Sequence, residues 1–267
     1  MRTARFAGRS ALVTGAGAGF GRATAVGLAR DGARHVAILE RDASRLDAVC
    51  AEVEAHGATA LPIGVDLRDA TTAALAVEQT AVAAGGLDVV ISNHVAMGDE
   101  VSFLDGTDAA WEHELSVNLT SHYVLTRNAA RVMRDGGNGG SIAFTASVDA
   151  LGAEEGFTPY CVAKAGLVAL ARVMAVELAQ YRIRVNCVSP GPADTPGSVE
   201  LMGEEAMEHF RTKGFDGVPL RRLASVDDIA EAFLYLSSDA AAYVTGHNLV
   251  VDGGLTSYAY RVPKGKG

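Results

Sequence analysis

The strongest constraint on the fold is a glycine-rich turn between a short apolar run and a helical stretch. The run Ala11–Val13 leads into the segment 14–21, which carries four glycines, and an alanine-rich stretch follows over 22–30. Glycine lets the backbone turn tightly and approach a diphosphate, and the first N–H groups of a helix attract negative charge. A strand, a glycine turn and a helix in this order are typical of dinucleotide-binding units. We therefore expect the cofactor diphosphate to bind at Gly15, Gly17, Gly19, Phe20 and Gly21.

Apolar runs alternate with helical stretches along the rest of the chain. This alternation is typical of a parallel sheet covered on both faces. The 267 residues fit one large domain. The sequence thus predicts a single Rossmann-type, doubly wound α/β domain over residues 1–267, with helices on both faces of a seven-stranded, mostly parallel sheet. The expected strands cover 10–14, 35–40, 59–65, 88–92, 140–145, 183–188 and 248–251.

Acidic residues stand at the ends of the second and third expected strands. Glu40 can accept hydrogen bonds from an adenosine ribose and would repel a 2′-phosphate, which favours NAD over NADP. Arg41 follows directly and can favour the phosphate instead, so this choice stays open. Asp66 and Leu67 are placed to hold the adenine. Alternatively, Asp66 is the N-cap of the next helix.

Tyr160 and Lys164 form the chemically most informative pair. Residues four apart on a helix share a face, so the phenol and the ammonium point into the same space. A nearby cation is expected to lower the pKa of the tyrosine from its usual value of about 10. Such a phenol can exchange a proton with an alcohol or a ketone.

With Ser147 upstream, these motifs resemble the short-chain dehydrogenase/reductase family over nearly the whole chain. The glycine turn looks like the family's cofactor motif, and Ser147, Tyr160 and Lys164 match its catalytic spacing. The resemblance implies a fourth catalytic residue at Asn118. It also implies cofactor contacts from Tyr160, Lys164, Asn93, Pro190, Gly191 and Thr195.

One segment departs from the family pattern. The family usually carries Asn-Asn-Ala-Gly after its fourth strand, whereas this chain reads Ser-Asn-His-Val over 92–95. We expect Asn93 to keep its role in bracing the sheet. His94 replaces a small residue beside the expected cofactor ribose. It either packs internally or provides a polar contact for the substrate.

If the resemblance holds, the reaction is hydride transfer between the nicotinamide and a carbinol or carbonyl carbon. Tyr160 would exchange the proton, and Lys164 would lower its pKa and bind the nicotinamide ribose. Ser147 would hydrogen-bond the substrate oxygen. Asn118 would hold a water that relays protons from Lys164.

Three stretches are expected to select the substrate: 94–103, 149–157 and a mobile lid over about 193–220. Candidate substrate contacts are His94, Asp149 and Phe157. Glu154 and Glu155 near the expected mouth favour a neutral alcohol or ketone of small to medium size, alicyclic or aromatic. The alternatives are an NADP-dependent 3-oxoacyl carrier-protein reductase and a dinucleotide-binding sensor without turnover.

Composition bounds the partners and the compartment. A net charge of −9 argues against nucleic acid as a partner. The N-terminus lacks a signal-peptide core, no apolar run has transmembrane length, and the three cysteines show no metal or redox spacing. We therefore expect a cytoplasmic, metal-free protein that does not bind membranes. The family is commonly tetrameric, and the tail 255–267 either docks on a neighbouring subunit or frays.

Overall fold

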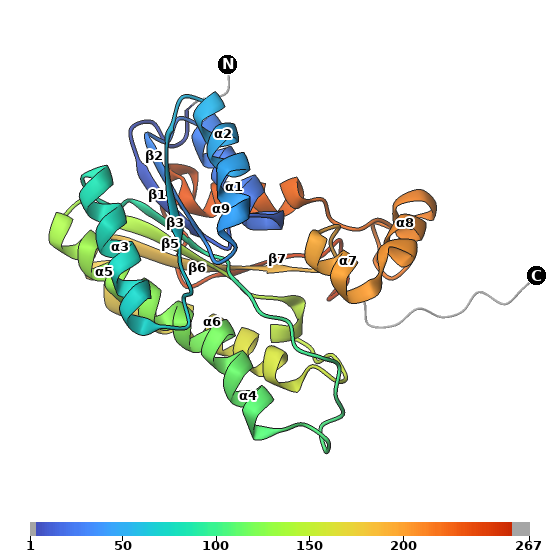
Figure 1. The fold of residues 1–267 in the computed structure, drawn as a ribbon. Helices are drawn as coiled ribbons and strands as arrows, with labels where there is room; N and C mark the ends of the chain where they lie inside the picture. The colour runs from blue at the N-terminus through green and yellow to red at the C-terminus, as the bar shows by residue number, and fades with distance from the viewer. Residues whose placement is uncertain (1–3, 258–267) are drawn as a thin grey trace, which may run out of the picture.

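A single parallel sheet forms the centre of the molecule (Figure 1). The computed structural model describes residues 4–257. Its seven strands run in the order β3-β2-β1-β4-β5-β6-β7, and every neighbouring pair is parallel. The predicted doubly wound sheet is therefore confirmed, and it is wholly rather than mostly parallel. The strands are β1 Ser10–Thr14, β2 His35–Glu40, β3 Thr59–Gly64, β4 Val89–Ser92, β5 Gly140–Thr145, β6 Ile183–Pro190 and β7 Asn248–Val251.

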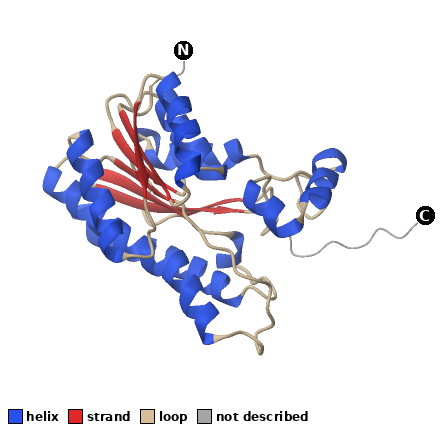
Figure 2. Cartoon of the chain, in the orientation of Figure 1, coloured by secondary structure: helices blue, strands red, loops and turns tan. Residues whose placement is uncertain are grey.

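Helices cover both faces of this sheet (Figure 2). One face is packed by α1 (Gly19–Arg30), α2 (Leu46–Ala55) and α9 (Val226–Ser237). The other face is packed by α3 (Ala70–Ala84), α5 (Ser121–Gly136) and α6 (Thr158–Leu178). α4 (Asp108–Leu115) lies beside α6, and α7 (Pro196–Met202) and α8 (Glu204–Lys213) form a separate lobe beyond the sheet.

Alternating side chains of the strands divide the core into two layers. Val13 and Ile38 pack beneath α1 and α9, whereas their neighbours Leu12 and Leu39 pack on the opposite face. The central strands β1, β4 and β5 are buried and largely apolar because both of their faces are covered. Burial of these side chains in two layers fixes the register of the sheet.

The strand order reverses between β1 and β4. The connection after β1 leads towards one edge of the sheet, and the connection after β4 leads towards the other. Ligands of open α/β sheets bind beyond the carboxyl ends of the strands at such a reversal. The glycine turn after β1 and the segment after β4 both lie at this point.

Candidate active site

The glycine turn is too tightly packed to accept side chains at two of its positions. A Cβ atom at Gly21 would lie 2.2 Å from the Gly15 carbonyl oxygen, and one at Gly15 would lie 2.9 Å from the Cα of His94. Gly15 and Gly19 also adopt positive φ angles of 58° and 54°. Ala18, at the N-cap of α1, provides no side-chain cap for the first turn. The N-terminus of α1 is thus open to an anionic ligand, as a diphosphate site requires.

Glu40 reaches from the end of β2 to this turn. Its Oε2 accepts a hydrogen bond from the Gly17 amide at 3.0 Å, and its Oε1 accepts from the amides of Arg41 and Asp42 at 2.9 and 3.1 Å. These three bonds fix the carboxylate beside the turn. A negative charge therefore stands where the sequence predicts the adenosine ribose.

Asp66 pairs with Arg68 instead of capping a helix. The N-cap of α3 is Asp69, whose side chain accepts from the amide of Thr71 at 2.7 Å, so the alternative role suggested for Asp66 is wrong. Hydrogen bonds from Arg68, together with the charges of Arg68 and Arg41, lower the pKa of Asp66 to about 2. Leu67 is buried in the core against the sheet.

Asn93 ties three strands together at their carboxyl ends. Its Nδ2 donates to the carbonyl oxygens of Thr14 and Gly15, both at 3.2 Å. Its Oδ1 accepts from Thr145 Oγ1 at 2.8 Å, and its amide donates to Thr14 Oγ1 at 2.8 Å. Asn93 therefore bridges β1, β4 and β5, as predicted.

His94 turns its ring into the protein. Thr14 Oγ1 lies 2.8 Å from its Nδ1, and Ser121 Oγ lies 2.6 Å from its Nε2. Burial lowers the pKa of His94 to about 3, and the charge of Lys164 acts in the same direction. Since both ring nitrogens have internal partners, this geometry favours the packing interpretation over contact with the substrate.

The predicted catalytic residues Ser147 and Tyr160 meet at the start of α6. Ser147 follows β5, and a hydrogen bond joins its hydroxyl to Tyr160. The Ser147 hydroxyl donates to Asp149 Oδ2 at 2.7 Å and accepts from the Asp149 amide at 3.2 Å. Phe157 is buried at the N-cap of α6, and its carbonyl accepts from the Cys161 amide at 3.0 Å.

Lys164 is only 1% exposed and lies beneath Tyr160. Its Nζ donates to the Thr145 carbonyl at 2.8 Å and stands 5.4 Å from the centroid of the Tyr160 ring. Burial lowers the pKa of Lys164 to about 8.

The pKa of Tyr160 is shifted in the direction opposite to our expectation. Burial raises it above its usual range, the hydrogen bond with Ser147 lowers it, and Asp149 and Glu154 raise it further. The cation that was expected to lower this pKa points at a backbone carbonyl and lies against the face of the ring. The protein by itself thus favours the neutral phenol.

Asn118 fastens the segment after β4 to a π-helical turn between α4 and α5. This turn covers Ser116–Thr120. Asn118 Nδ2 donates to the Ala96 carbonyl at 2.7 Å, and its Oδ1 accepts from the Ala96 amide at 2.9 Å. One helical turn earlier, the buried Glu114 accepts a hydrogen bond from the amide of Gly98. The side-chain amide of Asn118 therefore already bonds Ala96 through both its nitrogen and its oxygen. To hold the predicted water, Asn118 would have to use its backbone groups or the remaining hydrogen-bonding positions of its side chain.

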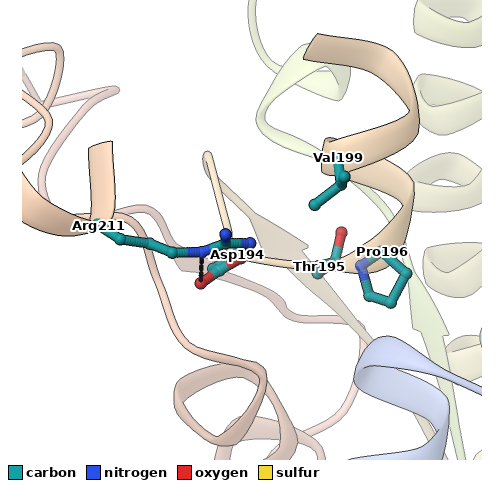
Figure 3. A pocket seen from close by; sticks show the side chains of 5 residues that line it. All are labelled: Asp194, Thr195, Pro196, Val199 and Arg211. Carbon is teal, nitrogen blue, oxygen red and sulfur yellow. Dashed lines mark hydrogen bonds and ion pairs between the residues drawn. The ribbon is translucent and has the colours of Figure 1, made fainter. Parts of the chain in front are cut away.

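The end of β6 leads to the lobe formed by α7 and α8. Pro190 is the last residue of β6, and the Gly191 amide donates to the Val251 carbonyl at 3.0 Å. Thr195 caps α7 by accepting from the Ser198 amide at 3.1 Å. An open pocket of about 430 Å³ lies here (Figure 3). It is lined by Asp194, Thr195, Pro196, Val199 and Arg211.

Comparison with known proteins agrees with this arrangement. Residues 15–256 match the family model described as Enoyl-(Acyl carrier protein) reductase. The chain is 36% identical to the L-rhamnose 1-dehydrogenase (NAD(P)(+)) of Azotobacter vinelandii, over 92% of this chain and 96% of that protein. It is 37% identical to an uncharacterised short-chain type dehydrogenase/reductase of Sinorhizobium fredii, over 93% of this chain and 97% of that protein. The chain belongs to the short-chain dehydrogenase/reductase family.

A solved structure supports the same assignment. Levodione reductase superimposes with a TM-score of 0.88 at 31% identity, covering 96% of this chain and all of that one. As a member of the short-chain dehydrogenase/reductase family, the protein is an NAD(P)-dependent oxidoreductase that acts on CH–OH groups. The open N-terminus of α1 and the close-packed Gly15 and Gly21 fit such a dinucleotide.

The sequence did not single out several residues that build this short-chain dehydrogenase site. Thr14 and Thr145 stand at the ends of β1 and β5 and bind Asn93. Ser121 and His122 hold His94 from α5. A threonine at the end of a buried strand was the available signal, since a hydroxyl in that position needs a partner.

The expected lid contains α7, α8 and the loop to residue 220. Met207 is fully buried, and Phe210 and Phe215 pack edge to face with ring centroids 4.9 Å apart. Arg211 bonds Asp194 at 2.8 Å and Glu204 at 2.6 Å. Phe210 and Phe215 thus pack within the segment itself.

Three further expectations concern metals, membranes and the tail. Within residues 4–257, no three histidine, cysteine or acidic side chains gather closely enough to hold a metal ion. None of the described helices is long and apolar enough to cross a membrane. Most of the tail, residues 258–267, lies outside the described part of the chain.

Proposed function

We propose that the protein transfers a hydride between NAD(H) and a neutral secondary alcohol or ketone of small to medium size, alicyclic or aromatic. The observation that carries this proposal is the convergence of Ser147, Tyr160 and Lys164 between the end of β5 and the start of α6. The relatives named for L-rhamnose and levodione support an alcohol or ketone as the substrate. The bound nicotinamide would supply the hydride chemistry at its C4 atom.

In this proposal each residue of the convergence has one role. Tyr160 takes the alcohol proton during oxidation or returns it during reduction, and Ser147 hydrogen-bonds the reacting oxygen. Lys164 lies beneath the phenol and would hold the nicotinamide ribose. Gly15, Gly17, Gly19, Phe20, Gly21, Asn93, Pro190, Gly191 and Thr195 would line the remainder of the cofactor site.

The preference for NAD rests on the charges around the end of β2. The Glu40 carboxylate is fixed there by three backbone amides. The charge of Arg41 acts on Asp66, but that acid already pairs with Arg68, so Arg41 stays the residue that opposes this preference. The fixed carboxylate of Glu40 disfavours a 2′-phosphate.

Replacement of Tyr160 by Phe tests the mechanism. The phenylalanine keeps the ring but removes the proton, so we expect turnover to fall by at least about 100-fold. Binding of NADH, followed by fluorescence titration, should stay nearly unchanged. Turnover at the wild-type rate in Y160F would refute the role of Tyr160. Tight NADH binding by the wild type without turnover of any alcohol or ketone would instead support the sensor alternative.

We also propose that the protein is a cytoplasmic homotetramer and that residues 193–220 act as a lid. Family membership supports the tetramer, and the separate lobe of α7 and α8 supports the lid (Figure 1). Light scattering after size exclusion tests the first. Hydrogen exchange of residues 196–213 with and without NADH tests the second, since closure should slow exchange there.

A further inference from the structure

We infer that the preferred substrate carries a second hydroxyl group on the carbon next to the reacting carbinol, and that this hydroxyl binds Asp149. The inference rests on the proposed function and names the substrate class of the same site. It follows from how the hydrogen-bonding positions of Ser147 are used, from the surroundings of Asp149 and from the charge at the mouth of the site.

The single proton of the Ser147 hydroxyl is already donated within the protein. A serine hydroxyl has one proton to donate and two lone pairs that accept. The proton goes to Asp149 Oδ2 at 2.7 Å, and one lone pair accepts from the Asp149 amide at 3.2 Å. Ser147 can therefore stabilise a substrate oxygen only after withdrawing its proton from Asp149.

This withdrawal leaves a carboxylate without a partner. Asp149 is half-buried, and within residues 4–257 its carboxylate has no ion pair and accepts no other side-chain hydrogen bond than that from Ser147. A carboxylate that loses a hydrogen bond in a partly buried place loses the stabilisation of a charged bond. A donor on the substrate can restore it. Since Asp149 lies one hydrogen bond from Ser147, this donor must stand next to the reacting oxygen, as the second hydroxyl of a vicinal diol does.

Two further acids make the surroundings of Asp149 negative. Gly156 packs so closely on Glu100 that a Cβ atom there would lie 2.5 Å from its Cγ. The Val101 amide donates to the Gly156 carbonyl at 3.0 Å, which joins this loop to the stretch that carries Asp149 and Glu154. Burial raises the pKa of Glu154, and the charges of Asp149 and Glu100 raise it too. A neighbouring carboxylate on the substrate would therefore be repelled, whereas a hydroxyl would be accepted.

Three cyclohexane derivatives test the inference on the whole enzyme: the vicinal diol, its monomethyl ether and the corresponding 2-hydroxy carboxylate. The ether keeps the size and the oxygen but has no second proton to donate. We expect kcat/KM for the better diol isomer to exceed that for the ether by about 10-fold or more, the worth of one charged hydrogen bond. The carboxylate should be the poorest substrate. A diol that performs no better than its ether would overturn the inference.

Variants assign the preference to Asp149. In Asp149→Ala the ratio of kcat/KM for diol and ether should fall to within about twofold of one. In Asp149→Asn, which still accepts a hydrogen bond but carries no charge, it should fall only partly. Glu155→Gln removes an exposed charge from the same stretch and should leave the ratio unchanged. NADH binding and the unfolding midpoint verify that each variant is folded. A ratio that persists in a folded Asp149→Ala would contradict the inference.

The proposed function and the inference fail differently. If the wild type turns over none of these alcohols nor the ketones derived from them, the proposed function fails and the inference falls with it. If it turns over the diol and the ether equally well, the proposed function stands and only the role of Asp149 is refuted.

Discussion

The imidazole rings of His94 and His122 stack face to face, with centroids 3.8 Å apart and planes within 10° of each other. Ser121 Oγ donates to the Val117 carbonyl at 2.6 Å, so it accepts from Nε2 of His94. His122 Nε2 donates to the His94 carbonyl at 3.0 Å, which leaves its Nδ1 to accept from Ser92 Oγ at 2.7 Å. Each ring thus carries a single proton, on Nε2, and each Nδ1 faces a hydroxyl. The network is complete only while both histidines are neutral.

This pair should make the protein sensitive to acid. Burial lowers the pKa of His94 to about 3 and that of His122 well below its usual range. The unfolded chain takes up protons near pH 6.5 and the folded chain does not, so the stability present above that pH is lost as the pH falls below it. Each histidine contributes a slope of about 1.4 kcal/mol per pH unit. Urea unfolding at pH 7.5, 6.5 and 5.5 measures the slope, which His94→Ala should reduce and exposed His56→Gln should not.

Replacement of Glu40 by Gln should weaken the preference for NAD. The amide keeps the size of the side chain but removes the charge that would repel a 2′-phosphate. We expect the ratio of kcat/KM for NADP⁺ to that for NAD⁺ to rise by about 10-fold. Arg41→Ala tests the alternative that Arg41 selects NADP. If Arg41 selected NADP, its loss would lower the same ratio, and if Glu40 dominates, the ratio should change little.

Gly21→Ala should disrupt the cofactor turn. The added methyl would lie 2.2 Å from the Gly15 carbonyl oxygen and 2.7 Å from Asn93 Nδ2, so the backbone must shift. We expect a loss of about 1–3 kcal/mol in the free energy of unfolding and weaker NADH binding. Gly136→Ala is the matched control because a Cβ atom there meets nothing within 4 Å. It should leave NADH binding intact, and equal effects of the two changes would contradict the close packing at Gly21.

Glu114→Gln should stabilise the protein at neutral pH. Glu114 is 6% exposed, and its Oε2 is buried without a hydrogen-bond partner among the described residues. Burial raises its pKa, so the folded state disfavours the charged form that prevails above the pKa of the unfolded chain. Glutamine removes this charge and can still accept from the Gly98 amide. The thermal midpoint of the variant should exceed that of the wild type at pH 7.5, and the gain should vanish towards pH 4. The exposed Glu112→Gln should show no such gain.

The sequence by itself determined the class of the fold and the order of its motifs. All seven expected strands exist, with ends that differ from the prediction by at most two residues, as when β6 extends to Pro190. The glycine turn precedes α1, and the spacing of Tyr160 and Lys164 brings them together on α6. These features are local: apolar periodicity, glycine geometry and helical spacing act within a few residues of the chain.

Only the tertiary structure decided which partner each polar side chain binds. His94 turns inward because Thr14 at the end of β1 and the adjacent Ser121 and His122 of α5 come from two other parts of the chain to meet it. Lys164 donates to the Thr145 carbonyl. The pKa of Tyr160 is therefore set mainly by burial and not by the cation four residues away. A hydrogen bond or a pKa depends on distances of a few ångströms between residues far apart in sequence and on how much water is excluded around them. Spacing along the chain fixes neither quantity.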